Sequence, residues 1–176
     1  MPKCLNVKMT KYGFTLMEAI VAIFVITTGI VGVSSLVTQT ISSSTFSENR
    51  LIAAYLVQEG IEIVRNIRDT NWLQGLSWDN GLGAGEYEVD YNAVLTFCPS
   101  ICDYDHNLRF LKIDGGFYNY DSGNNTSFKR KITISEEVYP PGSGYYDKMI
   151  VRVEVLWEEK GKPHSVSAQE NLYNWY

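Results

Sequence analysis

The chain has 176 residues, enough for one folded domain and a membrane segment but too few for two full domains. Apolar residues make up 45% and aromatic residues 13%, which excludes a disordered chain. Subtracting the three lysines of the first 13 residues from the 15 basic residues leaves 12, against 20 acidic residues. Nonspecific nucleic-acid binding depends on neutralising phosphates, so we expect no nucleic-acid partner.

The N-terminal segment joins a basic leader to a long apolar run. Lys3, Lys8 and Lys11 precede residues 19–36, which carry no charge. As a helix, these roughly 18 residues span about 27 Å, close to the thickness of the hydrocarbon core. The leader predicts a cytoplasmic N-terminus and an extracytoplasmic C-terminal part. A secretory signal peptide is the alternative, but no small-residue cleavage pattern closes the run before Thr38.

A single acid, Glu18, stands where the apolar run begins, and a Gly13–Phe14 junction separates it from the leader. A glutamate held at the membrane interface beside Lys11 is the simplest interpretation. However, the order of these elements resembles the N-terminal signature of type IV prepilins and of type II secretion pseudopilins. That signature is a short basic leader, a glycine, and then Phe-Thr-Leu-hydrophobic-Glu at the start of a transmembrane helix.

The resemblance implies a role for each residue of the junction. A prepilin peptidase would cut after Gly13 and methylate the new amino group of Phe14. Glu18 would pair with the N-terminal amine of a neighbouring subunit. The implied partners are other pilin subunits, the inner-membrane assembly platform and the membrane itself, and the implied destination is a cell-surface filament.

Beyond the membrane run, a second apolar pattern predicts that the helix continues, from Phe14 to about Arg68. Its stripe has helical spacing and comprises Ala53, Leu56, Val57, Gly60, Ile63, Val64 and Ile67. Arg65 and Arg68 fall largely off this stripe. Serine is a poor helix former, so we expect the helix to be weakest at residues 42–44.

The rest of the chain alternates with the two-residue period of β-strands. Candidate strands cover residues 87–91, 109–113, 128–135, 150–157 and 165–172, separated by turns rich in glycine, asparagine and proline. The sequence therefore predicts an α+β fold, with the long N-terminal helix packed on an antiparallel meander. Tryptophans are expected in or around its core.

This layout is pilin-like. It divides the chain into a leader (1–13), a transmembrane half-helix (14–37), an amphipathic half-helix (38–71) and a β-sheet head (72–176). The Gly-Ile-Val-Gly-Val segment and the strand ending at Trp157 resemble PilV-like minor pilins.

Setting aside Cys4 in the leader, Cys98 and Cys102 remain as a closely spaced pair. In an exported domain such a pair predicts a short-loop disulfide. Free thiols are an alternative. A zinc site is disfavoured because zinc usually takes four ligands and only His106 lies nearby.

Asp103, Asp105, Asn107 and Asp114 occupy positions 1, 3, 5 and 12 of a calcium-loop spacing. Leu108 replaces the glycine that such a loop needs, and no helices flank it. A solvated loop without metal is the favoured interpretation.

The sequence offers no support for catalysis. Only His106 and His164 are available, and neither lies in a nucleophile, metal or phosphate motif, so we expect neither an enzyme nor a cofactor. The one basic cluster, residues 129–131, could contact DNA in an uptake pilin, but a polar sheet edge is favoured.

The leading hypothesis is a minor pilin that assembles into a type IV pilus through its N-terminal helix. The alternatives are a minor pseudopilin of a type II secretion system, a membrane-anchored binding module or adhesin that does not polymerise, and, least favoured, a tethered enzyme.

Overall fold

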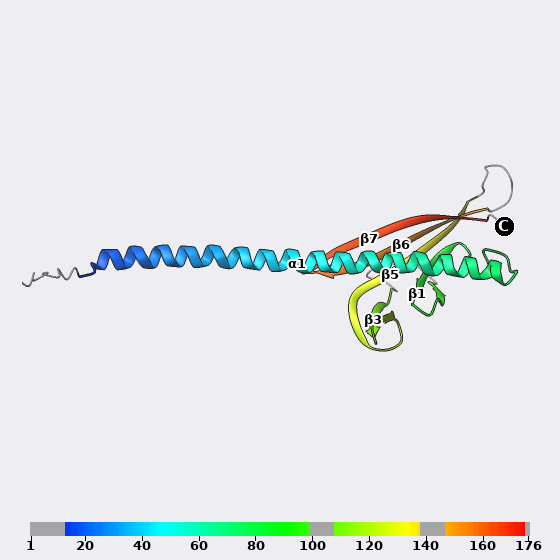
Figure 1. Cartoon of the computed structure of the whole chain (residues 1–176), viewed down its shortest axis with the longest axis horizontal. Coiled ribbons are helices and arrows are strands. Elements are labelled where there is room, and N and C mark those ends of the chain that lie inside the picture. Colours follow the sequence, from blue (N-terminus) through cyan, green and yellow to red (C-terminus); the bar gives the residue numbers. More distant parts are fainter. Residues whose placement is uncertain (1–12, 99–107, 138–146, 175–176) are drawn as a thin grey trace, which may run out of the picture. The chain divides into compact units, whose positions relative to one another are not determined.

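The computed structural model describes residues 13–98, 108–137 and 147–174. These residues form one helix and seven strands (Figure 1). In chain order they are α1 (Leu16–Leu73), β1 (Gly85–Val89), β2 (Leu95–Phe97), β3 (Phe110–Asp114), β4 (Phe117–Asn119), β5 (Asn124–Glu137), β6 (Lys148–Glu159) and β7 (Lys162–Tyr173). The chain divides into two compact units between Thr45 and Phe46. The α+β class and the antiparallel pairing are confirmed; β2 and β4 were not predicted.

Both ends of α1 have recognisable caps. Thr15 accepts the backbone N–H of Glu18 on its side-chain oxygen at 3.3 Å, the bond of an N-cap residue. At the other end, the N–H of Leu76 reaches Asn71 O at 2.9 Å and the N–H of Gly75 reaches Trp72 O at 3.0 Å. This is a Schellman motif, with Gly75 at φ 70° in the left-handed region. The helix thus extends beyond the expected end at Arg68, and it is unbroken at residues 42–44.

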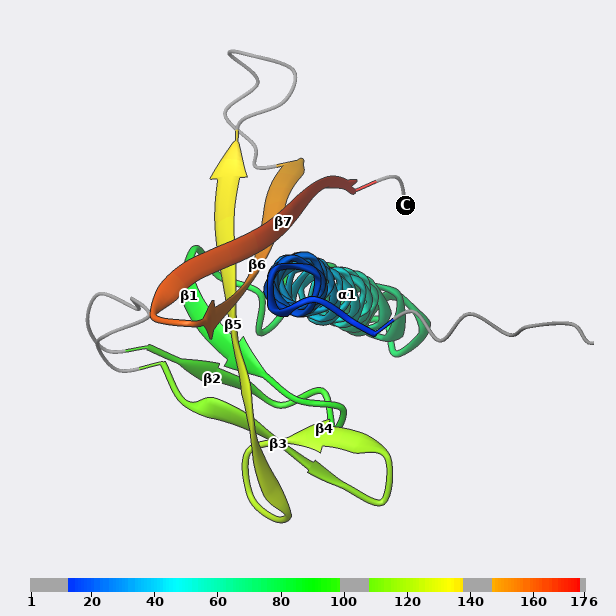
Figure 2. The same ribbon diagram turned by 90° about the vertical axis from the view of Figure 1, so that its left-hand side faces the viewer.

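The sheet is organised around β5, which has partners on both edges (Figure 2). One edge pairs with β6 through ten residue pairs. The other edge pairs with β1 near Ile132 and with β3 nearer the start of β5. The β3–β5 pairing has a register irregularity between Phe110 and Lys112. The β1–β2 and β3–β4 hairpins extend the sheet on that side. Only β5, β6 and β7 follow the simple meander that we expected.

The β6–β7 hairpin has a two-residue connection. Glu159 pairs with Lys162, which leaves only Lys160 and Gly161 in the turn, both with positive φ (53° and 74°). Two central residues with positive φ define a type I′ turn, whose twist matches that of the flanking strands. The strands then stay paired through twelve residue pairs.

The core of the second unit, Phe46–Tyr176, lies between the second half of α1 and one face of the sheet. The predicted helix stripe is buried or packed against the core, including Ala53 and Val64, which are fully buried. On β6 the alternate residues Met149, Val151, Val153, Val155 and Trp157 are buried. Trp78 is also buried, so these two tryptophans belong to the core as expected.

Gly60 allows the helix to approach the sheet closely. A Cβ atom built on Gly60 would lie 2.8 Å from Cγ1 and 3.3 Å from Cγ2 of Val153. The valine cannot easily turn aside, because its branched side chain is stiff at χ1 and is fully buried. A side chain at position 60 would therefore have to push helix and strand apart.

We predict that Gly60→Ala destabilises this unit, although alanine is normally better than glycine in a helix by about 1 kcal/mol. Overpacking of a full core costs about 1–3 kcal/mol, so the net free energy of unfolding should fall by about 1 kcal/mol. Urea unfolding of the full chain in micelles, followed by tryptophan fluorescence, measures this. Gly83→Ala is the control, because only Tyr87 Oη lies within 4 Å of its Cβ, at 3.8 Å. A Gly60→Ala midpoint equal to or above that of the control would contradict the prediction.

Candidate functional site

The N-terminal unit presents apolar side chains to its surroundings on every side of the helix. Phe14 and Leu16 are almost 80% exposed, and the large apolar residues through Ile41 are more than half exposed. Soluble monomers rarely expose so large a contiguous apolar surface. By length and composition, α1 is able to cross a membrane.

Threonine hydroxyls in this unit donate hydrogen bonds to backbone carbonyls of the helix. Thr28 donates its hydroxyl to Phe24 O at 2.9 Å, and Thr27 donates to the same carbonyl at 3.0 Å. Farther along, Thr38, Thr40 and Thr45 each donate to the carbonyl four residues earlier. These bonds lower the cost of placing hydroxyls in an apolar medium.

The predicted cleavage and assembly residues lie together at the start of α1. Gly13, Phe14 and Glu18 are all exposed, and nothing lies within 4 Å of a Cβ built on Gly13. The Glu18 backbone completes the cap with Thr15, but its carboxylate makes no hydrogen bond or ion pair within the described part of the chain. The side chain is thus available to a partner outside this chain.

The cysteine and calcium predictions fall only partly within the described residues. Cys98 is buried and disulfide-bonded. Cys102 lies outside the described residues, so the Cys98–Cys102 pairing stays a prediction.

Three of the calcium candidates, Asp103, Asp105 and Asn107, also lie outside the described residues. The fourth calcium candidate, Asp114, accepts a hydrogen bond from Ser122 Oγ at 2.7 Å. Where the structure describes the chain, no three His, Cys, Asp or Glu side chains form a group able to hold a metal.

The predicted polar edge at residues 129–131 is wrong, because Arg130 is fully buried. Its guanidinium donates to Val89 O from Nε at 3.2 Å and from Nη2 at 2.5 Å. Its Nη1 donates to Leu56 O at 3.1 Å and to Glu59 Oε2 at 2.7 Å. Every nitrogen therefore has a partner, which offsets the loss of hydration. The sequence held the signal, since Arg130 alternates in phase with Phe128, Ile132 and Ile134.

The two lysines beside Arg130 are also occupied. Lys129 is buried, with its ammonium 4.4 Å from the centre of the Phe110 ring. Lys131 lies 3.4 Å from a Glu86 carboxylate oxygen. The cluster thus presents no basic patch for DNA.

Arg68 is a second cation that we placed incorrectly, off the buried stripe. It is only 4% exposed, pairs with Asp69 at 2.8 Å and lies over the Trp72 ring.

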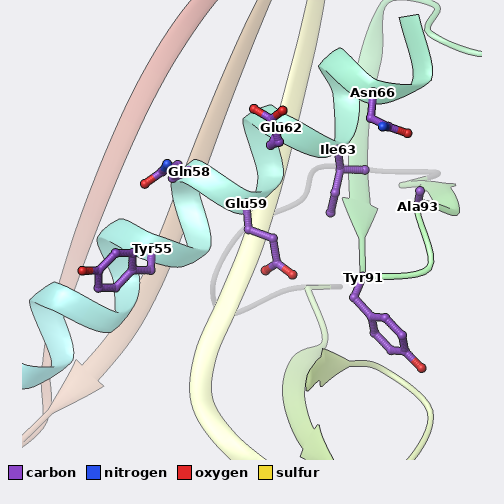
Figure 3. A pocket seen from close by; sticks show the side chains of 8 residues that line it. All are labelled: Tyr55, Gln58, Glu59, Glu62, Ile63, Asn66, Tyr91 and Ala93. Atoms are coloured by element: carbon purple, nitrogen blue, oxygen red, sulfur yellow. The ribbon is translucent and has the colours of Figure 1, made fainter. Parts of the chain in front are cut away.

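A groove of about 580 Å³ lies between α1 and the turn that follows β1 (Figure 3). The helix contributes Tyr55 and Glu59, and the turn contributes Tyr91. Figure 3 shows the Glu59 carboxylate pointing from the helix toward the segment that carries Tyr91. Sequence reasoning missed this groove because its walls are about 30 residues apart in the chain.

The two carboxylates of the groove are paired with arginines. Glu59 binds Arg130 at 2.7 Å, and Glu62 forms an ion pair with Arg65. Arg65 also binds Glu170 at 2.6 Å. This hydrogen bond raises the pKa of Arg65; burial lowers the pKa, and the charges of the nearby carboxylates raise it further. Burial, with a smaller contribution from Glu59, raises the pKa of Tyr118 above its ordinary value. Arg65 is therefore positive and Tyr118 neutral at neutral pH.

Comparison of the chain with protein-family models, curated proteins and solved structures gave no match.

Tyr120 is a buried titratable group whose pKa is strongly raised. It is buried, and its hydroxyl has no hydrogen-bond partner among the residues the structure describes. Burial raises its pKa well above the ordinary value of 10, against the lowering effect of the Arg130 charge. The guanidinium of Arg109 covers the ring, with Cζ 4.4 Å from its centre.

We predict that Tyr120→Phe flattens the loss of stability at alkaline pH. The unfolded tyrosine loses its proton near pH 10, whereas the folded one holds it to higher pH, so wild-type stability falls as pH rises above 10. Removing the hydroxyl should reduce this slope by up to about 1.4 kcal/mol per pH unit. Urea unfolding between pH 9 and 11.5 measures it. Tyr55→Phe, at a tyrosine that is 64% exposed, should keep the wild-type slope. Equal slopes in wild type and Tyr120→Phe would contradict the assignment.

Proposed function

We propose that the chain is a prepilin of the minor-pilin type, processed by a prepilin peptidase and assembled through α1 into a type IV pilus. The observation that carries this proposal is the combination at the start of α1. A basic leader and a Gly13–Phe14 junction precede Glu18, whose carboxylate has no partner among the described residues, at the start of a helix whose large apolar side chains are exposed. A minor pseudopilin of a type II secretion system shares this N-terminus and is the alternative within the family.

The physical chemistry of the helix start supports pairing between subunits. A carboxylate carried into lipid without a partner costs a few kcal/mol. Cleavage after Gly13 would leave an ammonium group at Phe14, one residue before the cap at Thr15. That ammonium would add its charge to the positive end of the helix dipole. The Glu18 carboxylate of a neighbouring subunit would neutralise this end, and both charges would gain from pairing in a dry environment.

The alternative of another class is a membrane-anchored binding module that never polymerises. It keeps the apolar helix as an anchor and gives Glu18 no role. The two proposals therefore differ in what processing and Glu18 should do.

We predict that a co-expressed prepilin peptidase removes the first 13 residues and adds one methyl group to Phe14. Gly13→Ala should stay full length, because the signature that the chain resembles has glycine itself, without a side chain, before the cut. Intact-mass spectrometry of the purified chain reads out both results. Gly29→Ala is the matched control, since nothing lies within 4 Å of a Cβ there. A wild-type chain that stays full length would overturn the prepilin proposal and favour the anchored module.

We also predict that Glu18→Ala is processed normally but is at least about tenfold depleted from filaments, the effect of losing roughly 1.4 kcal/mol of assembly energy. An epitope-tagged chain in its native cells, compared between the sheared-filament and membrane fractions, provides the measurement. Glu48→Ala removes another exposed glutamate of α1 and should be incorporated like the wild type. Equal incorporation of Glu18→Ala, or a wild-type chain confined to the membrane fraction, would count against assembly through Glu18.

A further inference from the structure

The groove between α1 and the turn after β1 carries polar groups that the protein itself does not use. Within the described residues, the side-chain amides of Gln58 and Asn66 and the hydroxyls of Tyr55 and Tyr91 make no hydrogen bond. Each amide offers two donors and an acceptor, and each hydroxyl offers one donor and an acceptor. A groove this size falls within the range of about 300–1,000 Å³ that suits small ligands.

Aromatic rings frame the same groove. Tyr55 is 64% and Tyr91 46% exposed, and Tyr91 lies against the ring of Phe117, with 5.2 Å between ring centres. The turn that carries Tyr91 is held by hydrogen bonds from Asn92 N to Asp90 Oδ1 and from Ala93 N to Asp90 O, at 3.0 and 3.1 Å. Ala93 has φ 60°, a left-handed conformation that only a fixed turn imposes on alanine. This wall is therefore built in advance of binding.

The charges of the groove indicate a neutral ligand. Each carboxylate of the groove has an arginine beside it, Glu59 with Arg130 and Glu62 with Arg65. Arg65 is shared with Glu170, so the attraction for a cation is reduced but not cancelled. What remains unused is a set of neutral donors and acceptors next to exposed aromatic rings. Polyhydroxylated rings match this set, because their hydroxyls both donate and accept while their C–H faces pack on aromatic rings.

We propose that this groove binds an oligosaccharide, with Tyr55 and Tyr91 packing against sugar rings and Gln58 and Asn66 bonding the hydroxyls. The free oxygens of Glu59 and Glu62 accept further hydroxyl protons. The proposal does not depend on whether the chain polymerises, because the groove belongs entirely to the unit that begins at Phe46.

The test is a printed oligosaccharide array probed with the full chain in a non-glycosidic detergent, since alkyl glycosides would compete for the groove. The strongest-binding oligosaccharide of the array is then titrated against the wild type and single variants. Tyr55→Ala and Tyr91→Ala should each weaken binding at least about tenfold, and Asn66→Ala should weaken it as well. Tyr55→Phe, which keeps the ring, should retain most of the affinity. Gln169→Ala, an exposed amide outside this groove, is the control.

Three results would overturn the proposal. The first is an array without any bound oligosaccharide. The second is binding that Tyr55→Ala and Tyr91→Ala leave unchanged while their urea midpoints match the wild type. The third is saturable binding of a lysine- and arginine-rich nonapeptide with no oligosaccharide bound, which would mean that the groove selects cations.

Discussion

The buried guanidinium of Arg130, in β5, connects this strand to α1 and to β1, which are far apart from it in sequence. It bonds the backbone carbonyls of Leu56 in α1 and Val89 in β1, and it pairs with Glu59. A cation with no solvent exposure is stable only while all of these partners are in place. These bonds therefore fix the position of α1 against the sheet. Gly60 allows the close approach to Val153 that this position requires. The groove inherits the same constraint, because Glu59 both holds Arg130 and lines the groove.

The apolar half of α1 obeys a different constraint. Its side chains find no core within its own unit, and its threonine hydroxyls bond back to the helix instead of projecting unused donors. Such a surface needs lipid or other helices around it. Among the described residues at its start, the exposed Glu18 carboxylate is not satisfied by lipid. Lipid can cover the apolar side chains of the segment, whereas Glu18 needs either the water of the membrane interface or an opposite charge.

Periodicity was sufficient to predict the fold class, the helix stripe and five of the seven strands, because burial on one face leaves a direct trace in the sequence. The short strands β2 and β4 have too few residues to show alternation. Their pairing depends on the neighbours that they extend. Arg130 shows how a charged residue can be misjudged. It shares the two-residue alternation of Phe128 and Ile132, which is typical of a buried face, but its charge and its lysine neighbours led us to predict a polar edge. The groove was beyond sequence reasoning, since Tyr55 and Tyr91 come to line one groove only through tertiary packing.

Arg65 in α1 and Glu170 in β7 form an ion pair across 105 positions, so the contacts between α1 and the last strand can form only late in synthesis. At about 5–20 residues per second, a ribosome needs roughly 5–20 seconds to make the chain between these two residues. Throughout this interval the stripe of α1 has no β6 or β7 to cover it, and such long-range contacts fold slowly. The N-terminal segment needs none of those later strands to become helical. If the apolar half of α1 enters a bilayer early, the nascent chain is anchored there. The buried stripe of α1 would then meet β6 and β7 at the membrane surface.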